Sequence, residues 1–237
     1  MTPLADWIER YLLRTREVST VALSSVPLIL VYGLLLPVAS PWARSGVDLI
    51  SGPLLAELST LTWVAIQVAI ALALFAFAID RRQHTVREHL SWSWPPILEA
   101  CLWGLSLGGL VLFLMDEVHL LSTSAPQTTF EISLIDRIVI SAGAGLHEEL
   151  LFRLLALPLV SWLLSRALGV PRRAALIGAV ILSSLGFSLA HHFAGEPLDA
   201  FVFAYRLTAG LVFATLFVTR GFAVTAWAHA AYDFSVI

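Results

Sequence analysis

The sequence predicts an all-α protein, a transmembrane helical bundle that crosses the bilayer about seven times. The first observation is composition: of the 237 residues, 58% are apolar and only 13% are charged, whereas soluble domains carry about 25% charged residues. The second is a series of long apolar runs, and the third is the placement of arginines between them. A water-soluble domain of this length would need far more charge to cover its surface.

The apolar runs have the length of membrane-spanning helices. A helix needs about 20 apolar residues to cross a hydrocarbon core of about 30 Å, whereas strands of a membrane barrel would alternate in segments of about ten residues. The last run is short. The candidate spans are Val18–Ser40, Leu61–Ile79, Pro96–Met115, Leu134–Leu164, Ala174–His192, Ala200–Thr219 and Phe222–Ile237.

Arginines between the spans predict the orientation. They gather before the first span and after the second, fourth and sixth, positions that share one side of the membrane: Arg10, Arg14, Arg16, Arg81, Arg82, Arg87, Arg166, Arg172, Arg173 and Arg220. The positive-inside rule assigns this side, and with it the N-terminus, to the cytoplasm. Only Arg44 lies on the opposite side, which instead receives Asp116, Glu117, Glu131, Glu196 and Asp199.

The chain is expected to be one membrane-embedded domain, 1–237, whose motif-bearing core is 134–237. The connections 43–60 and 116–133 are too short for a folded domain, and no basic cluster suggests nucleic acid. Cys101 is the single cysteine, so no intrachain disulfide can form. The first apolar run is too long for a signal peptide, which favours a retained span. A monomer is expected.

Ionisable residues inside the spans are the most informative feature. Each costs about 2.5–3.5 kcal/mol on insertion scales, so such residues persist where they pair, line a cavity or act. The first two spans contain little more than Gln67. The fourth, fifth and seventh contain Glu148, Glu149, Arg153, His191, His192, His229 and Asp233. We expect these three spans to meet at one cavity.

The fourth span contains two adjacent acids followed by an arginine. Glu149 and Arg153 stand four apart on one helix face, in the favourable order. Glu148 is rotated by roughly 100° from Glu149, so Arg153 need not neutralise it. Glu148 is therefore a candidate general base; the alternative is a structural ion cluster. The zinc-protease motif His-Glu-x-x-His is absent, because Leu151 stands at the position of its second histidine.

A glutamate and a histidine in such a cavity can activate water for attack on a carbonyl carbon. His229 and Asp233 are four apart and share a helix face. A second histidine can donate to the oxyanion that forms. Alternatively, Glu148, His191 and His229 resemble the His₂Glu ligands of a catalytic divalent metal such as zinc. Both routes lead to hydrolysis.

The motifs resemble those of the CAAX-protease and bacteriocin-processing family of intramembrane endopeptidases, also called CPBP or Abi. The resemblance rests on Glu148-Glu149-x-x-x-Arg153, Phe187-x-x-x-His191 and His229-x-x-x-Asp233, in this order, and covers about residues 136–233. It implies that Glu148 and His191 activate water and that His229 and the residue at position 233 stabilise the oxyanion. It further implies that Glu149 and Arg153 shape the site. Both metalloproteases and metal-independent glutamate proteases are described in this family.

Position 233 departs from the family, where asparagine is frequent. An ionised aspartate only accepts hydrogen bonds. Asp233 therefore either carries a proton, orients His229 or helps to hold a metal. By its position His191 lies near the non-cytoplasmic end of its span.

Two functions other than proteolysis stay open: a proton- or ion-coupled transporter and a non-catalytic scaffold or immunity factor. A transporter of this kind often has two related halves with broken helices, and the sequence shows no such symmetry. The resemblance implies a peptide or protein substrate in or at the lipid bilayer: a prenylated C-terminal peptide, a bacteriocin leader or a regulatory membrane peptide. It also implies a bacterial plasma membrane.

Overall fold

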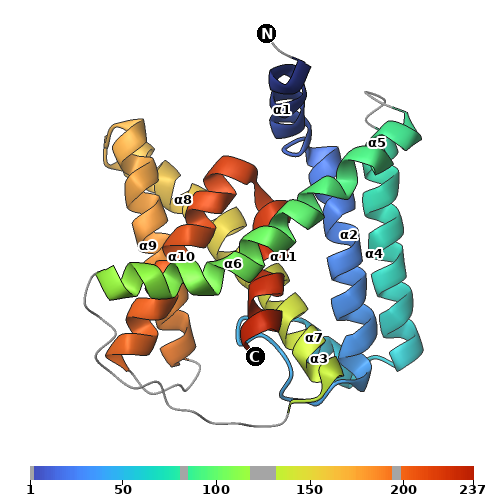
Figure 1. Cartoon of the computed structure of the whole chain (residues 1–237). Helices are drawn as coiled ribbons and strands as arrows, with labels where there is room; N and C mark the ends of the chain where they lie inside the picture. The colour runs from blue at the N-terminus through green and yellow to red at the C-terminus, as the bar shows by residue number, and fades with distance from the viewer. Residues whose placement is uncertain (1–2, 81–84, 118–131, 194–198) are drawn as a thin grey trace.

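Helices make up all the regular structure in residues 3–80, 85–117, 132–193 and 199–237, the part of the chain that the computed structural model describes. This confirms the all-α prediction. In chain order they are α1 (Pro3–Arg14), α2 (Val18–Leu35), a 3₁₀ turn (Leu36–Val38), α3 (Ser51–Glu57), α4 (Thr60–Asp80), α5 (Val86–Ser93), α6 (Pro95–Glu117), α7 (Leu134–Gly143), α8 (Leu157–Trp162), α9 (Arg172–Phe193), α10 (Ala200–Arg220) and α11 (Phe222–Val236). Figure 1 shows their arrangement.

The predicted fourth span is one long helix with π-helical stretches. Between α7 and α8 lie the π-helical segments η2 (Ala144–Glu148) and η3 (Leu150–Ala156), and η4 (Leu163–Ala167) follows α8. π-Helical turns are rare and frequently occur at functional sites. Here η2 ends at Glu148 and η3 contains Arg153, and Glu149 lies between the two segments.

Six helical segments in the described residues are long and apolar enough to cross a membrane. They correspond to the first six predicted spans. The seventh prediction corresponds to α11, which has 15 residues and is therefore only about 22 Å long. About seven spans is thus a fair prediction, with α11 as a membrane-embedded helix shorter than the hydrocarbon core.

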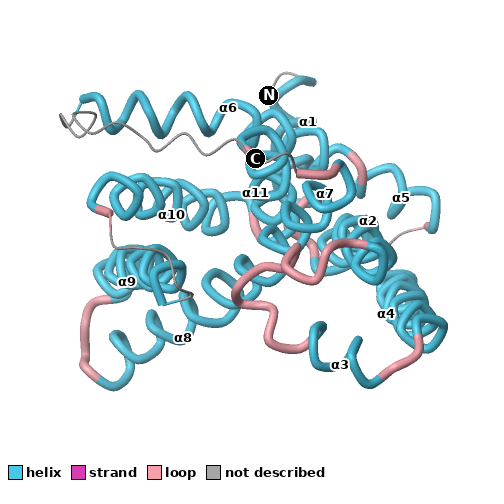
Figure 2. Tube along the Cα trace, turned by 90° about the horizontal axis from the view of Figure 1, so that it is seen from below, coloured by secondary structure: helices cyan, strands magenta, loops and turns pink. Residues whose placement is uncertain are grey.

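The short helix α11 lies at the centre of the bundle. It packs against α2, α6, α7 and α10, and Figure 2 shows it among these helices. Small residues allow the close approach: a Cβ at Gly104 of α6 would lie 2.4 Å from the backbone oxygen of Ala228. A core of ten buried residues joins α6, α10 and α11: Ala100, Leu107, Val111, Met115, Ala209, Phe213, Leu216, Val224, Ala228 and Tyr232.

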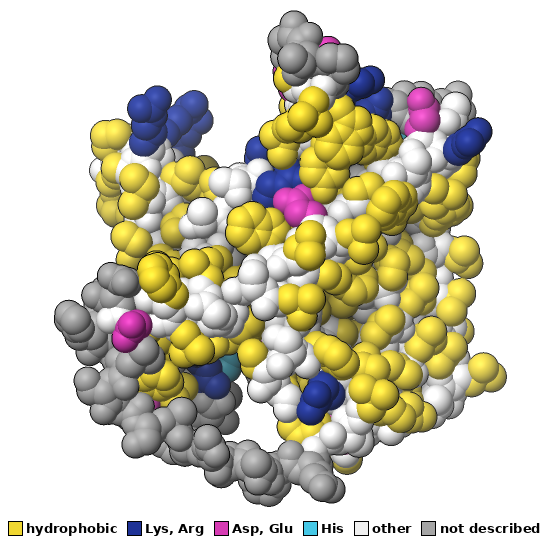
Figure 3. Space-filling model, in the orientation of Figure 1, with side chains coloured by type: hydrophobic (Ala, Val, Ile, Leu, Met, Phe, Trp, Pro, Cys, Tyr) yellow, Lys and Arg dark blue, Asp and Glu magenta, His cyan; other side chains and the backbone are white. Residues whose placement is uncertain are grey.

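The outer surface is apolar, as a lipid-facing surface must be. Exposed leucine, isoleucine and phenylalanine side chains are frequent along α4 and α6, and hydrophobic side chains are spread over much of the face in Figure 3. The arginine-bearing segments, α1, α5 and the α8–α9 connection, lie together at the upper end in Figure 1, opposite α3. The sequence prediction that these segments share one side therefore agrees with the fold.

One arginine of that set is buried. Arg220, at the end of α10, is only 8% exposed and pairs with Glu99 of α6 through two contacts of 2.7 and 2.6 Å. Glu99 also accepts a hydrogen bond from Tyr11 of α1 at 2.6 Å, and Arg220 donates to Thr15 at 3.0 Å. Sequence analysis used Arg220 only as a marker of orientation. In the structure, its contacts connect the end of α10 to α6 and to the end of α1.

Candidate active site

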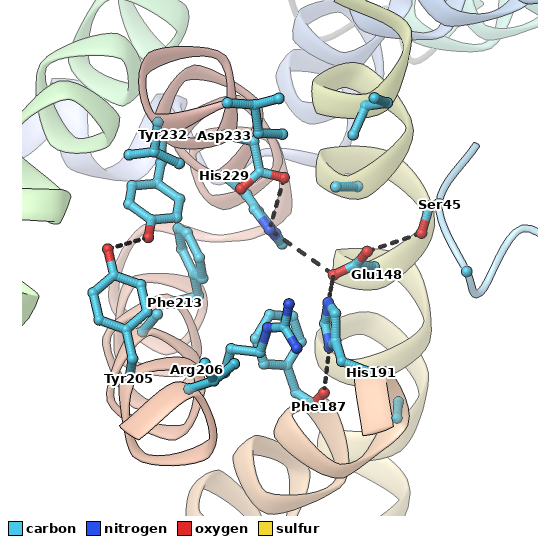
Figure 4. Close-up of a pocket in the computed structure, with 18 of the residues that line it drawn as sticks. Ser45, Glu148, Phe187, His191, Tyr205, Arg206, Phe213, His229, Tyr232 and Asp233 are labelled. Atoms are coloured by element: carbon cyan, nitrogen blue, oxygen red, sulfur yellow. Dashed lines mark hydrogen bonds and ion pairs between the residues drawn. The ribbon is translucent and has the colours of Figure 1, made fainter. Parts of the chain in front are cut away.

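Glu148, His191, His229 and Asp233 line one cavity of about 660 Å³. Figure 4 shows Glu148 on the fourth-span helix, His191 on α9 and the other two on α11, with their polar atoms directed toward one another. Residues 44–47, between α2 and α3, and the first turns of α10 also line the cavity. The three polar spans of the sequence therefore meet, as predicted.

A glycine brings the two central elements close together. A Cβ at Gly145 of η2 would lie 2.4 Å from the backbone oxygen of Ala226 in α11, so only glycine fits without movement of one helix. Because Gly145 precedes Glu148 by three residues and Ala226 precedes His229 by three, this contact sets the separation of the two side chains. Glu148 and His229 are 5% and 2% exposed.

The predicted pair of Glu149 and Arg153 is present and completely buried. Arg153 Nη1 lies 3.1 Å from Glu149 Oε1, and neither side chain is exposed. Arg153 also donates to the backbone oxygen of Gly210 at 3.2 Å. Its guanidinium carbon lies 4.3 Å from the ring centre of Phe187, a distance suited to a cation–π contact. The motif of the fourth span is thereby joined to α9 and α10.

Glu149 has a second partner that the sequence did not predict. Its Oε1 lies 2.7 Å from Nδ1 of His229. Since a carboxylate only accepts, the imidazole donates from Nδ1. In the same way, His191 Nδ1 lies 2.9 Å from the backbone oxygen of Phe187 and donates to it. Both histidines are thus fixed in orientation, and their Nε2 atoms point into the cavity.

Both Nε2 atoms face the same oxygen of Glu148. Glu148 Oε2 lies 3.7 Å from His191 Nε2 and 3.9 Å from His229 Nε2. These distances are too long for direct hydrogen bonds. Among the described residues, this buried oxygen has no hydrogen-bond partner. With Nδ1 protonated, a neutral imidazole accepts at Nε2 and an imidazolium donates from it. The space between the two Nε2 atoms and Glu148 Oε2 therefore suits a water molecule, which can accept and donate, or, with both rings neutral, a cation.

Asp233 lies near Nε2 of His229, the ring nitrogen that points into the cavity, and not near Nδ1. Its Oδ2 is 3.6 Å from His229 Nε2, and its side chain is 16% exposed. Sequence analysis left open whether Asp233 orients His229. In the structure, Glu149 makes the orienting contact, at Nδ1. Asp233 therefore faces the cavity together with Glu148.

Several residues of the cavity were missed by sequence analysis. Ser45 donates to Glu148 Oε1 at 2.9 Å from a loop 103 residues earlier. Phe213 stacks on the ring of His229 with centroids 4.4 Å apart. The hydroxyl of Tyr232 donates to that of Tyr205, and Arg206 also lines the cavity. Nothing in the sequence indicated Ser45.

The donor set fits a divalent metal chemically. Two imidazole nitrogens and a carboxylate oxygen are the donors of a catalytic zinc site, and the unpartnered Glu148 Oε2 faces both nitrogens. Ligands on a tetrahedral zinc lie about 3.4 Å apart, whereas groups bridged by one water lie roughly 4.5 Å apart. The observed 3.7 and 3.9 Å fall between these values. As they stand, no three His, Cys, Asp or Glu side chains in the described residues form a metal-holding group.

Comparison with known families gives a match in the C-terminal part of the chain. Residues 130–235 match the family model described as type II CAAX prenyl endopeptidase Rce1-like. No curated protein and no solved structure shows a significant match. The match contains all six site residues predicted from the sequence and agrees with the resemblance found there. With the six apolar helices, it identifies an integral membrane protein.

Proposed function

We propose that this chain is an intramembrane endopeptidase whose general base is Glu148, because residues 130–235 match the model of the Rce1-like type II CAAX prenyl endopeptidases, a family of membrane proteases. The catalytic core is 134–237, within a single membrane-embedded domain. The observation that carries the proposal is the unpartnered Oε2 of Glu148, which faces Nε2 of both His191 and His229.

Glu148 and His191 hold the attacking water. Oε2 and Nε2, 3.7 Å apart, each accept a hydrogen bond from this water. As the water oxygen bonds to the carbonyl carbon of the substrate, its proton moves to Glu148 and the carbonyl oxygen becomes an oxyanion. When the C–N bond breaks, Glu148 returns the proton to the departing amine. The carboxylate is then ready for the next cycle.

His229 stabilises the oxyanion in its protonated form. The carboxylate of Glu149 accepts from Nδ1 at 2.7 Å and supports the positive charge of the imidazolium, as the aspartate does in a Ser-His-Asp triad. Asp233, 3.6 Å from Nε2, adds to this support. The Nε2 proton then points into the cavity, where it can donate to the developing charge.

If the enzyme uses a metal, Glu148, His191 and His229 are the residues that would hold it. A bound divalent ion such as zinc supplies a Lewis acid and an acidified water at neutral pH. The orienting contacts from Glu149 and from the Phe187 carbonyl are of the kind that support metal-bound histidines.

The substrate is a membrane-associated peptide or protein, and prenylated peptides are the first class to examine. Apolar side chains along the cavity wall, among them Leu112, Phe201 and Val202, suit an apolar segment next to the scissile bond. The proposed location is a bacterial plasma membrane with the N-terminus in the cytoplasm. The protein is expected to act as a monomer.

The test compares membranes that contain the wild type, Glu148→Gln or the control Glu57→Gln, using mass spectrometry of new peptide termini. Glu57 is an exposed carboxylate on α3, so its loss should leave cleavage unchanged. We expect termini in the wild type and the control and none with Glu148→Gln, which keeps the side chain's shape but removes its basicity. Equal termini in all three would overturn the proposal in favour of a scaffold or transporter.

Removal of metal with a chelator decides between the two forms of the mechanism. Loss of cleavage that returns with zinc, but not with magnesium, would identify a metalloprotease, for which Glu148, His191 and His229 are the proposed ligands. Full activity after exhaustive chelation, with no metal detected by elemental analysis, would identify a metal-independent glutamate protease.

A further inference from the structure

The wall of the cavity includes a segment from the first half of the chain. Residues 43–50 form the last part of the connection between α2 and α3, and Arg44, Ser45, Gly46 and Val47 line the cavity beside the predicted site residues. This segment lies outside the family match at 130–235. Figure 4 shows it passing next to the helix that carries Glu148, with Ser45 directed at the carboxylate.

The contact between Ser45 and Glu148 is short and buried. Ser45 Oγ lies 2.9 Å from Glu148 Oε1, and the two residues are 8% and 5% exposed. An ionised carboxylate has no proton to give, so the hydroxyl is the donor, and hydrogen bonds to charged groups are among the stronger ones. The end of a glutamate side chain otherwise rotates over a broad range. The bond to Oε1 therefore leaves Oε2 facing the two histidines.

The segment is held in place on both sides of Ser45. Before it, Ser40 donates from its amide and its hydroxyl to Asp136 of α7, at 2.7 and 2.9 Å. Ala43 follows with no exposed surface. These contacts fix the entry of the segment against the helix that continues into η2 and Glu148.

After Ser45, the segment is anchored by Asp48. This carboxylate accepts from the Tyr32 hydroxyl and from the Ser51 amide at 2.9 Å, and its Oδ1 lies 3.6 Å from Nε2 of His147. Burial raises the pKa of Asp48, but the Tyr32 and Ser51 donors outweigh burial and hold its pKa below the usual range. The Asp48 amide in turn donates to the backbone oxygen of Ser45 at 3.0 Å, which links the anchor directly to the contact.

We propose that Ser45 is a positioning residue for Glu148 and that the 43–50 segment completes the active site from outside the family-matched region. This inference rests on the proposed function of Glu148 as general base. Ser45 acts through Glu148: it holds the carboxylate in the rotation that directs Oε2 at the water, and the Tyr32–Asp48 anchor holds Ser45.

The test measures kcat and KM of purified full-length protein on the substrate peptide identified from the new termini. Ser45→Ala should lower kcat about 10- to 100-fold, the range for loss of a hydrogen bond to a charged group. KM should change less than about threefold, because the bond acts on the base and not on substrate binding. Ser45→Thr keeps the hydroxyl and should restore most of kcat. Ser106→Ala, which removes an exposed serine hydroxyl on α6, should match the wild type.

A second pair of variants tests the anchor. Tyr32→Phe removes only the hydroxyl that donates to Asp48. Tyr32→Phe should lower kcat when residue 45 is serine. It should have no further effect in the Ser45→Ala background, because Tyr32 affects Glu148 only by holding Ser45 in place. Equal losses of kcat in the two backgrounds would show that the tyrosine does not act through Ser45 and would contradict the anchor.

The outcomes separate this inference from the proposed function. If the wild type cleaves, Glu148→Gln does not and Ser45→Ala cleaves like the wild type, the positioning role is wrong and the proposed function stands. A Ser45→Ala variant that loses kcat but is not restored by threonine would show a packing role instead. If Glu148→Gln cleaves normally, the proposed function itself fails.

Discussion

Replacing Arg153 by methionine is expected to destabilise the protein by about 3–5 kcal/mol, because it leaves the Glu149 carboxylate buried without its cation. Neither side chain of the pair has any exposure. Arg153 also donates to Gly210 and stacks over Phe187, so its loss weakens the contacts of the fourth-span helix with α9 and α10. The measurement is the free energy of unfolding, from titration with a denaturing detergent in mixed micelles.

Two control variants separate the buried charge from the loss of any arginine. Arg166→Met removes an exposed arginine from the end of the same helix and should change stability by less than about 0.5 kcal/mol. Arg153→Met combined with Glu149→Gln should recover part of the loss, since the unpaired charge is then gone. If the double variant is less stable than Arg153→Met alone, the destabilisation does not come from the uncompensated carboxylate.

The elements that sequence analysis predicted well are those governed by local rules. The apolar runs had to become helices, because a lipid environment leaves no other way to satisfy the backbone. The spacing of Glu149 and Arg153 predicted their pairing because both lie on one helix one turn apart. The convergence of Glu148, His191 and His229 followed from the cost of leaving ionisable groups in lipid.

The elements that sequence analysis missed depend on contacts between distant segments. Ser45 is 103 residues away from Glu148 in a connection with no motif, so no periodicity or spacing could associate the two. Glu149 was assigned to Arg153 alone, because the partner on its other side, His229, comes from a helix at the far end of the chain. Likewise, a marker of orientation such as Arg220 gives no sign of its pairing with Glu99.

The placement of α11 shows why sequence could not rank the spans. By length it is the weakest candidate, with 15 residues. Yet it carries two site residues and packs at the centre of the bundle, where neighbouring helices rather than lipid surround it. Its small residues, such as Ala226 against Gly145, matter for this position more than its apolar length.

Replacing His191 by alanine is expected to lower kcat by about 10²–10⁴-fold, the range for loss of a group that shares in proton transfer. His191 Nε2 and Glu148 Oε2 hold the same water in the proposed mechanism, so neither can position it alone. His192→Ala is the matched control: this neighbouring histidine faces Phe203, with ring centroids 5.9 Å apart, and is not among the residues that line the cavity. Its loss should change kcat less than about threefold.

The variant that combines His191→Ala with Glu148→Gln shows whether the two residues act as a unit. Groups that act on one water lose nearly all of their effect when either is removed, so the double variant should be about as slow as the slower single one. If the losses multiply instead, the two residues serve separate steps. Glu148 would then activate the water without His191, and the lone pair on His191 Nε2, 3.7 Å away, would be left for the substrate or for a metal.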